Sequence, residues 1–299
     1  MTSGSDTSPL PESLTLPAGA AAELSKEFDR AGYAVIESVV PQKVLGELIE
    51  TAQALTREHD FEADREVFRT DDRDSGRDRE FFASARGVRG FLEAEALDAS
   101  GNLAVSRDRA MNKIGHALHD SVPAIRAFAS CALVREAFAV AGLRGAHLVQ
   151  SMLIFKQPNI GGEVRWHQDA SYLRCEPQRV VGLWLALEAA DRENGCLWVV
   201  PGAHRGPLRE RYTVDWRTEQ GELSTIDRTP WPAADAVPLE VPAGSLVVFH
   251  DHLPHRSDAN RSARSRVALT LHAHDRASVW ASDNWLQRGH LAPFRLAEL

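Results

Sequence analysis

The second half of the chain changes texture at about residue 146, where short apolar runs rich in β-branched residues begin to alternate with turn signals. Runs of this length are typical of buried strands, and the Gly, Pro and Asn clusters between them mark turns. The runs are His147–Phe155, Val180–Glu188, Cys196–Val200, Gly244–Phe249 and Arg266–His274. Many short strands spaced in this way predict a β-sandwich or jelly roll over residues 146–275.

The part before this region, residues 19–145, is predicted to be largely helical. Residues 19–32 favour a helix that ends near Gly32, and Tyr33–Val40 is β-branched and strand-like. Pro41 opens a second helix, because apolar residues recur after it at helical spacing. Two further helices are expected, near residues 107–120 and 123–141.

The remaining segments are expected to lie outside the core. Residues 1–18 are rich in Ser, Thr, Pro and Gly and predict a disordered tail. Residues 57–85 are highly charged and weakly periodic; a solvated surface connection is favoured over an active-site lid. Residues 276–299 form a C-terminal extension. The sequence therefore predicts one domain over residues 19–299, mainly β with flanking helices (α+β).

Composition limits the classes of partner. Hydrophobic residues make up 43% and charged residues 25%, as in ordinary globular proteins. The net charge of −8, from 34 basic and 42 acidic residues, disfavours nucleic acid as the main partner. No apolar run approaches a membrane span, and the N-terminus lacks the pattern of a secretory signal. Three scattered cysteines give no disulfide framework, so we expect a cytoplasmic protein. With nucleic acid disfavoured and no membrane span, we expect its substrate to be a small molecule.

A candidate metal site is spread over the β-rich region. His167 and Asp169 stand two positions apart, so in an extended segment both side chains point to one face. With His255 they make two histidines and one carboxylate, the ligand set of non-haem Fe(II) oxygenases. On sequence alone His255 has only a modest lead over four nearby histidines, which are His250, His252, His272 and His274.

A candidate anion-binding arginine follows the second histidine. Arg264 and Arg266 share a strand face by parity. A buried guanidinium can bind a carboxylate through two parallel hydrogen bonds. Arg266 adjoins the apolar run Val267–Leu271 and is the better candidate for the interior, whereas Arg264 is expected to be solvated.

Other chemistries find less support in the residues. The chain contains neither a Gly-x-Ser-x-Gly nucleophile motif nor a Gly-rich phosphate loop. A structural zinc site would normally be rich in cysteine. Two histidines and one carboxylate also suit a catalytic zinc ion, so a zinc hydrolase stays open as an alternative.

Several longer segments carry a family resemblance that covers roughly residues 20–295. They are Asn112–His119, Gln150–Met152, Ile154–Pro158, Gly161–Val164, His167–Ser171, Glu193–Trp198 and Asn284–Gln287. Through these segments the chain resembles the phytanoyl-CoA dioxygenase family of Fe(II)/2-oxoglutarate oxygenases. The resemblance implies a double-stranded β-helix (a jelly-roll, cupin-like core), with Fe(II) as metal and 2-oxoglutarate and O2 as co-substrates.

The resemblance also implies roles for individual residues. The distal histidine of the family lies in a His-x-Ser segment, here His255-Arg-Ser257, and its oxoglutarate arginine follows eleven positions on, at Arg266 (266 − 255). Further co-substrate contacts are implied for Lys113, Met152, Trp184 and Ser257, with Gln168 as an addition. From the residues alone, Met152 and Trp184 would be interpreted as core side chains.

The resemblance implies hydroxylation of a substrate C–H bond, with 2-oxoglutarate decarboxylated to succinate and CO2. Related halogenases replace the carboxylate ligand with a small residue, whereas Asp169 is present here. The alternative from a different class is a metal-binding jelly-roll module without turnover. The sequence specifies neither the primary substrate nor the oligomeric state.

Overall fold

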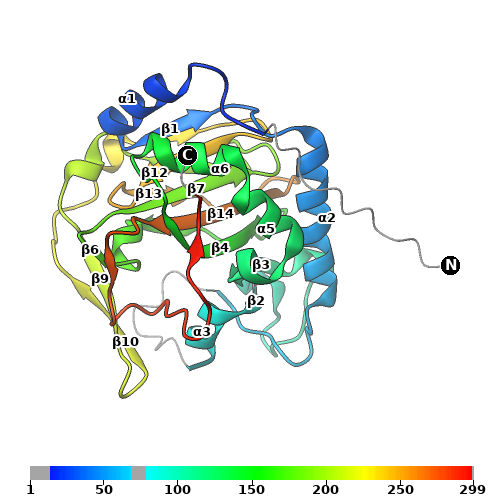
Figure 1. Cartoon of the computed structure of the whole chain (residues 1–299). Helices are drawn as coiled ribbons and strands as arrows, with labels where there is room; N and C mark the ends of the chain where they lie inside the picture. Colours follow the sequence, from blue (N-terminus) through cyan, green and yellow to red (C-terminus); the bar gives the residue numbers. More distant parts are fainter. Residues whose placement is uncertain (1–13, 69–78, 298–299) are drawn as a thin grey trace.

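The computed structural model describes residues 14–68 and 79–297, and two antiparallel sheets form its centre (Figure 1). The larger sheet has the order β1-β12-β7-β14-β4-β3-β2, with β16 also paired to β4. Its strands are β1 (Tyr33–Ile36), β2 (Val88–Leu92), β3 (Met111–His116), β4 (His147–Lys156), β7 (Val180–Ala186), β12 (Leu246–His250), β14 (Arg266–His274) and β16 (Phe294–Arg295). The five β-rich runs of the sequence are thus strands, and the mainly β prediction is confirmed.

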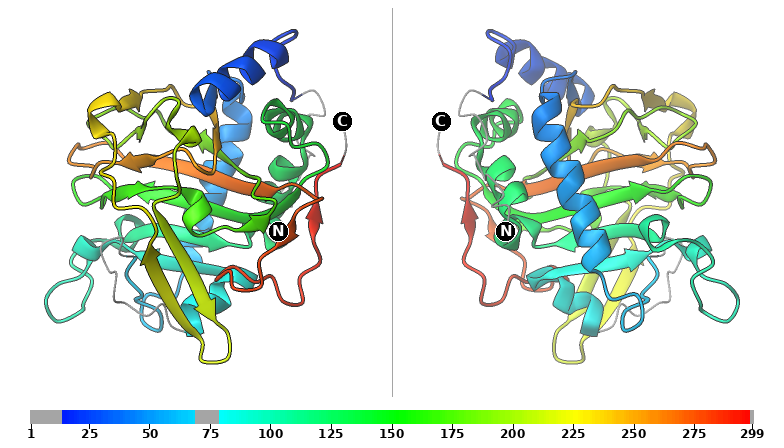
Figure 2. Two further views of the ribbon diagram at one scale, coloured as in Figure 1. Left: turned by 90° about the vertical axis from the view of Figure 1, so that its left-hand side faces the viewer. Right: turned by 90° about the vertical axis from the view of Figure 1, so that its right-hand side faces the viewer.

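The smaller sheet has four strands in the order β11-β8-β13-β5. They are β5 (Val164–His167), β8 (Leu197–Val199), β11 (Val237–Leu239) and β13 (His255–Ser257). Two strand pairs lie outside both sheets: β9 (Glu210–Asp215) with β10 (Gln220–Thr225), and β6 (Cys175–Glu176) with β15 (Val279–Trp280). The β9–β10 hairpin projects from the body of the molecule (Figure 2).

The described helices are α1 (Ala21–Ala31), α2 (Gln42–Glu58), α3 (Arg79–Ala83), α4 (Leu118–Ser121), α5 (Pro123–Ser130) and α6 (Ala132–Val140). Helix α2 runs across the outer face of the larger sheet, and α5 and α6 pack on the same side (Figures 1 and 2). Gly32 ends α1 in the left-handed region, at φ 84°, which a glycine adopts without steric cost. Within the described ranges, no helix is both long and apolar enough to cross a membrane.

Strand alternation gives the larger sheet two apolar faces. On β7 and β14, Leu183 and Leu269 belong to the core cluster that contains the helix residues Phe128 and Phe138. The alternate residues, such as Trp184, belong to a second cluster between the two sheets. The larger sheet is therefore covered by helices on one face and by the smaller sheet on the other, and the space between the sheets is where the candidate ligands lie.

The prediction of a helix over residues 107–120 is wrong. Met111–His116 forms β3, which pairs with β2 and β4 inside the larger sheet. Five of the six β3 residues are buried, so the strand lacks the alternation of polar and apolar residues that marks a strand in sequence. The part predicted as largely helical thus supplies three strands, β1 to β3, while residues 123–141 form α5 and α6 as expected.

The ends of the chain and the charged segment also differ in detail from prediction. Residues 14–18 were expected in a disordered tail, but Leu14 is buried and its carbonyl accepts a hydrogen bond from the backbone N–H of Leu133. Residues 1–13 lie outside the described residues. Within 57–85, α3 covers Arg79–Ala83, and residues 69–78 lie outside the described residues, so the lid alternative stays a prediction.

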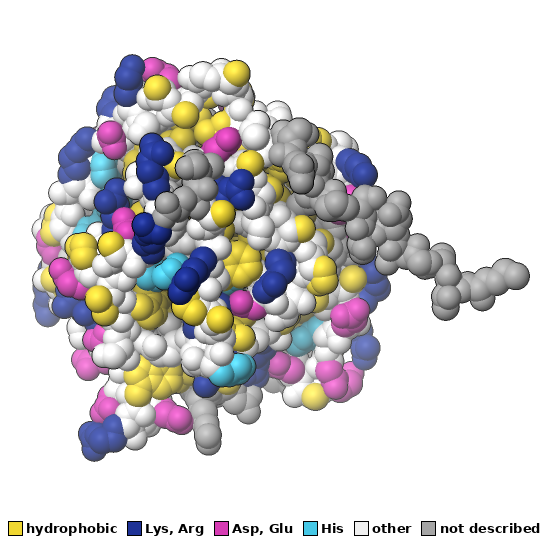
Figure 3. Space-filling view, viewed as in Figure 1, with side chains coloured by type: hydrophobic (Ala, Val, Ile, Leu, Met, Phe, Trp, Pro, Cys, Tyr) yellow, Lys and Arg dark blue, Asp and Glu magenta, His cyan; other side chains and the backbone are white. Residues whose placement is uncertain are grey.

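The surface carries both signs of charge. On the face shown in Figure 3, Lys and Arg side chains are interspersed with Asp and Glu and with neutral and apolar side chains. The three cysteines are free thiols, as the scattered spacing predicts.

Candidate metal centre

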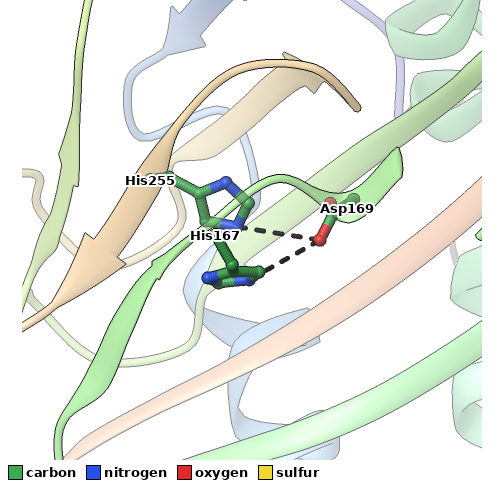
Figure 4. Close-up of side chains that lie close together, drawn as sticks. All are labelled: His167, Asp169 and His255. Carbon is green, nitrogen blue, oxygen red and sulfur yellow. Dashed lines mark ion pairs between the residues drawn. The ribbon is translucent and has the colours of Figure 1, made fainter. Parts of the chain in front are cut away.

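Three side chains from two strands and one turn converge between the sheets (Figure 4). His167 is the last residue of β5 and His255 is the first residue of β13, and the two stand directly opposite each other in the ladder. Asp169 begins the short 3-10 turn Asp169–Ser171 that follows β5. Because cross-strand partners share a face, antiparallel pairing brings together histidines that are 88 positions apart (255 − 167).

The ligand atoms are spaced as a common metal ion requires. The Asp169 Oδ1 atom lies 3.7 Å from Nε2 of His167 and 3.8 Å from Nε2 of His255. Protein ligands lie about 2.1 Å from a transition metal, so two of them on one ion are at most about 4.2 Å apart. One ligand atom from each of the three residues falls within 4.8 Å of the others. Within the described part of the chain, no other group of three His, Cys, Asp or Glu side chains brings its ligand atoms this close together.

Backbone carbonyls orient both imidazoles. Nδ1 of His167 lies 2.9 Å from the carbonyl oxygen of Arg165, and Nδ1 of His255 lies 2.9 Å from that of Leu253. If Nδ1–H donates to each carbonyl, Nε2 presents its lone pair toward Asp169, as in metal-binding histidines. The second coordination sphere therefore favours the tautomer that binds metal.

Electrostatics favour the metal-binding protonation states of His167 and Asp169. Burial, followed by the neighbouring His255, lowers the pKa of His167 to about 3, so its imidazole is neutral at physiological pH. Burial alone would raise the pKa of Asp169. The imidazoles of His272 and His255 outweigh burial and hold that pKa well below its ordinary value.

The four competing histidines have other contacts. His272 Nε2 lies 3.1 Å from Asp169 Oδ2, on the side of the carboxylate away from the other two histidines. His250 pairs with Asp251, His252 donates its backbone N–H to His250, and His274 packs against Trp280. The geometry thus selects His255, which the spacing alone left open.

Arg266 is the first residue of β14 and is 1% exposed. Among the described residues, its Nε and Nη1 atoms have no hydrogen-bond partner, and its guanidinium carbon lies 5.6 Å from the centre of the Trp184 ring. Burial lowers its pKa to about 10. A buried guanidinium with unsatisfied N–H groups is costly, so the arrangement fits an anionic ligand that supplies the missing acceptors. Arg264 is exposed and pairs with Asp191 at 2.7 Å, as expected for a solvated side chain.

Three adjacent strands form a wall beside Arg266. On β14, Thr270 stands opposite Met152 of β4 on one side and Trp184 of β7 on the other. Met152 has room because its other neighbour across the ladder is Gly115; a Cβ there would lie 3.0 Å from Met152 Cγ. The wall therefore combines an indole, a thioether and a hydroxyl at one level.

The two remaining residues expected around the co-substrate come from other strands. Ser257 ends β13 and is buried. Lys113 lies on β3 opposite Ile154, and its Nζ lies 3.2 Å from the centre of the Phe68 ring. Ser257 thus belongs to the smaller sheet and Lys113 to the larger one, and their contacts with a co-substrate stay predictions.

Gln168 does not join this group. Its Nε2 donates to the carbonyls of Pro207 and His252 at 3.2 and 2.9 Å, and its Oε1 accepts the Arg209 backbone N–H at 2.9 Å. The side chain points away from its neighbours His167 and Asp169 and ties their turn to two loops. These three hydrogen bonds favour a structural role for Gln168, and its contact with the co-substrate stays a prediction.

Two features were missed from sequence. Lys156, opposite Arg266 in the β14–β4 ladder, is 1% exposed and donates to the backbone carbonyls of Asp258 and Gly162; burial lowers its pKa to about 7. Its place in the segment Ile154–Pro158 was the available signal. Trp166, the residue before His167, packs on the outer side against Arg256, whose guanidinium carbon lies 5.4 Å from the centre of the indole ring.

Comparison with known families decides the class. The family model "Phytanoyl-CoA dioxygenase (PhyH)" matches residues 28–268. The chain belongs to the phytanoyl-CoA dioxygenase family. Membership confirms the expected enzyme class, a 2-oxoglutarate-dependent non-haem iron dioxygenase that uses Fe(II), 2-oxoglutarate and O2.

Curated relatives match over almost their whole length. The chain is 39% identical over 277 residues to "Phytanoyl-CoA dioxygenase 1" of Oryza sativa subsp. japonica, covering 91% of this chain and 96% of the relative. It is 36% identical over 282 residues to "Phytanoyl-CoA dioxygenase domain-containing protein 1" of Mus musculus, covering 90% and 95%.

Solved structures share the fold. The non-heme alpha ketoglutarate dependent carbocyclase SnoK from nogalamycin biosynthesis superposes with a TM-score of 0.61 at 19% identity, covering 93% of this chain and 92% of that one. EctD from S. alaskensis with 2-oxoglutarate and 5-hydroxyectoine superposes with a TM-score of 0.59 at 19% identity, covering 94% and 85%. The double-stranded β-helix expected from the resemblance is thereby confirmed as the fold.

Proposed function

We propose that this protein hydroxylates a C–H bond of a small-molecule substrate while 2-oxoglutarate is decarboxylated to succinate and CO2. One oxygen atom of O2 enters the product and the other enters succinate, so the reaction balances without a further reductant. The observation that carries the proposal is a pair of features in the buried region between the two sheets. His167, Asp169 and His255 form a three-ligand set, and the buried guanidinium of Arg266 lacks partners among the described residues.

The chain's own residues divide the work. His167, Asp169 and His255 would hold Fe(II) on one face, and the bound iron supplies O2 activation and oxidation of the substrate C–H bond. Arg266 would bind the distal carboxylate of 2-oxoglutarate through a charge-assisted pair, with Ser257 and Lys113 as further polar contacts. Trp184 and Met152 would wall the co-substrate and exclude water. This arrangement would hold the keto acid between the arginine and the metal ligands.

The carboxylate of Asp169 favours hydroxylation over halogenation. A halide needs the coordination position that a carboxylate occupies, and Asp169 is held in place by a 3.1 Å contact with His272. The buried arginine favours an oxygenase over a zinc hydrolase, because zinc hydrolysis uses a metal-bound water and has no need of an unpaired internal cation. A metal-binding module without turnover would gain nothing from burying an unpaired guanidinium, so Arg266 also favours an active enzyme.

The experiment is a turnover assay under ¹⁸O2 with Fe(II) and 2-oxoglutarate, with succinate measured by mass spectrometry and O2 uptake by electrode. We expect succinate to carry one ¹⁸O atom and to form in a 1:1 ratio with O2 consumed. Turnover should be lost in His255→Ala and retained in the matched histidine variant His252→Ala. Unlabelled succinate, or turnover that survives His255→Ala, would contradict the proposal.

A further inference from the structure

The two oxygens of the Asp169 carboxylate have different surroundings. Oδ1 faces the Nε2 atoms of His167 and His255 at 3.7 and 3.8 Å. Oδ2 lies 3.1 Å from Nε2 of His272, within hydrogen-bond distance for a charge-assisted pair. One oxygen is therefore presented to the ligand set, and the other is held on the far side by a residue that the family resemblance did not assign.

His272 lies on the same strand as Arg266, six positions along β14 (272 − 266), so strand parity places both side chains on the inner face. It is buried, at 4% exposure. One rigid strand in the middle of the larger sheet thus carries both the candidate anion receptor and the partner of the carboxylate ligand.

An aromatic side chain fixes the histidines around the carboxylate. The ring of Phe249 on β12 lies 5.0 Å from the ring of His255 and 6.3 Å from that of His272, measured between centroids. Phe249 packs against the backbone of Gly182, where an added Cβ would lie 2.4 Å from the phenyl ring. The glycine therefore leaves room for a ring that contacts a metal ligand on one side and its supporting histidine on the other.

We propose that His272 is a positioning residue that holds Asp169 as a one-oxygen ligand. The inference rests on the proposed metal site. If Nε2–H donates to Oδ2, the carboxylate cannot rotate about its Cβ–Cγ bond to chelate an ion through both oxygens. Chelation would use one of the positions that 2-oxoglutarate and O2 require on the open face. His272 thereby keeps that face open, as outer-sphere partners of metal ligands commonly do.

The test uses Co(II) alone as probe, because its visible absorption falls in intensity as its coordination number rises. His272→Phe fills the space without a donor, and His272→Gln retains an N–H donor. The matched control is His274→Gln, on the same strand face, where the ring packs on Trp280 and His147 and not on the ligand set. Affinity for Co(II) and the absorption spectrum are measured for each variant.

We expect His272→Phe to weaken Co(II) binding by about 10–100-fold and to lower the absorption per bound ion. His272→Gln should restore both in part, and His274→Gln should match the wild type. Wild-type affinity together with a wild-type spectrum in folded His272→Phe would overturn the inference.

A second measurement needs no destabilising variant. In the metal-free wild type, long-range ¹H–¹⁵N spectra of the imidazoles report the tautomer of each histidine, and His272→Gln identifies the signal of His272. We expect the Nε2–H tautomer; the Nδ1–H tautomer would overturn the inference. Neither readout involves 2-oxoglutarate. An absence of succinate formation combined with the expected cobalt change would therefore reject the proposed hydroxylation and still support the role of His272.

Discussion

Replacing Arg266 by Met should stabilise the metal-free protein and weaken its affinity for 2-oxoglutarate by about 30-fold or more. Burial lowers the pKa of Arg266 from 12.5 to about 10. Since the folded-state pKa lies below the unfolded one, the charged form is disfavoured by folding at every pH below about 10. Each pKa unit is worth about 1.4 kcal/mol, so the charge costs the folded state roughly 3 kcal/mol at neutral pH. Methionine fills the space without that cost.

The same substitution removes the partner of the co-substrate carboxylate. Loss of one partner in a desolvated charge pair costs about 2–5 kcal/mol, which corresponds to a roughly 30-fold to 5,000-fold rise in Kd. The assays are chemical denaturation of the metal-free protein and calorimetric titration of the Mn(II)-loaded protein with 2-oxoglutarate. Arg264→Met is the matched control, because Arg264 lies two residues before Arg266 and its ion pair with Asp191 is exposed to solvent.

The substitution should change stability and 2-oxoglutarate affinity in opposite directions, so a general loss of folding cannot produce both results. Arg266→Met should raise the free energy of unfolding while it raises the Kd for 2-oxoglutarate at least about 30-fold, and Arg264→Met should leave both quantities close to those of the wild type. Binding within threefold of wild type in Arg266→Met would show that this arginine is not the receptor. A clear loss of stability in the metal-free variant would show that its charge is already compensated inside the fold.

Three further outcomes are expected. Gln168→Leu removes the hydrogen-bond partner of two backbone carbonyls and one backbone N–H and should lower stability by about 2–4 kcal/mol in urea unfolding. A change below about 0.5 kcal/mol, the size of a surface effect, would contradict its structural role. Trp184→Leu should raise the Kd for 2-oxoglutarate about 10-fold or more through loss of the cation–π contact, and an unchanged Kd in titration would argue against the wall. The metal-free protein should lose stability as pH falls from about 6.5 toward 4. Burial lowers the pKa values of several histidines in the folded protein. As the pH falls through this range, the unfolded chain therefore binds protons before the folded one does, which favours unfolding. These histidines are His119 and His167, each with a folded-state pKa of about 3, and His204 and His274, each with a pKa of about 4. Equal unfolding free energies at pH 7.5 and pH 5 would contradict this expectation.

The strands of the jelly roll were predictable because their residues carry a strong local signal. The runs that became β4, β7 and β14 are apolar and β-branched and are bounded by turn residues. β3 was mistaken for a helix because it is buried on both faces, so its residues do not alternate between apolar and polar. Its place between β2 and β4 depends on tertiary pairing, which no local pattern contains.

The site residues also divide into those that a local pattern predicts and those that depend on tertiary pairing. Parity placed His167 and Asp169 on one face, but the partner of that pair among five histidines depended on the register between β13 and β5. The hydrogen bonds of Gln168 to the carbonyls of Pro207 and His252 were not predictable, because these residues are distant in sequence. His272 was one candidate ligand among several, and its contact with the second carboxylate oxygen became visible only in three dimensions.

The most direct test of the central claim is the anaerobic visible absorption of the metal-free protein during addition of Fe(II) and 2-oxoglutarate. A weak charge-transfer band that requires both additions is predicted, because the keto acid would chelate an iron held by His167, Asp169 and His255. The band should be absent at the same concentrations in Arg266→Met. If the wild type binds Fe(II) tightly and shows no band at saturating 2-oxoglutarate, the site is not an oxoglutarate-dependent iron centre, and the proposed hydroxylation is wrong.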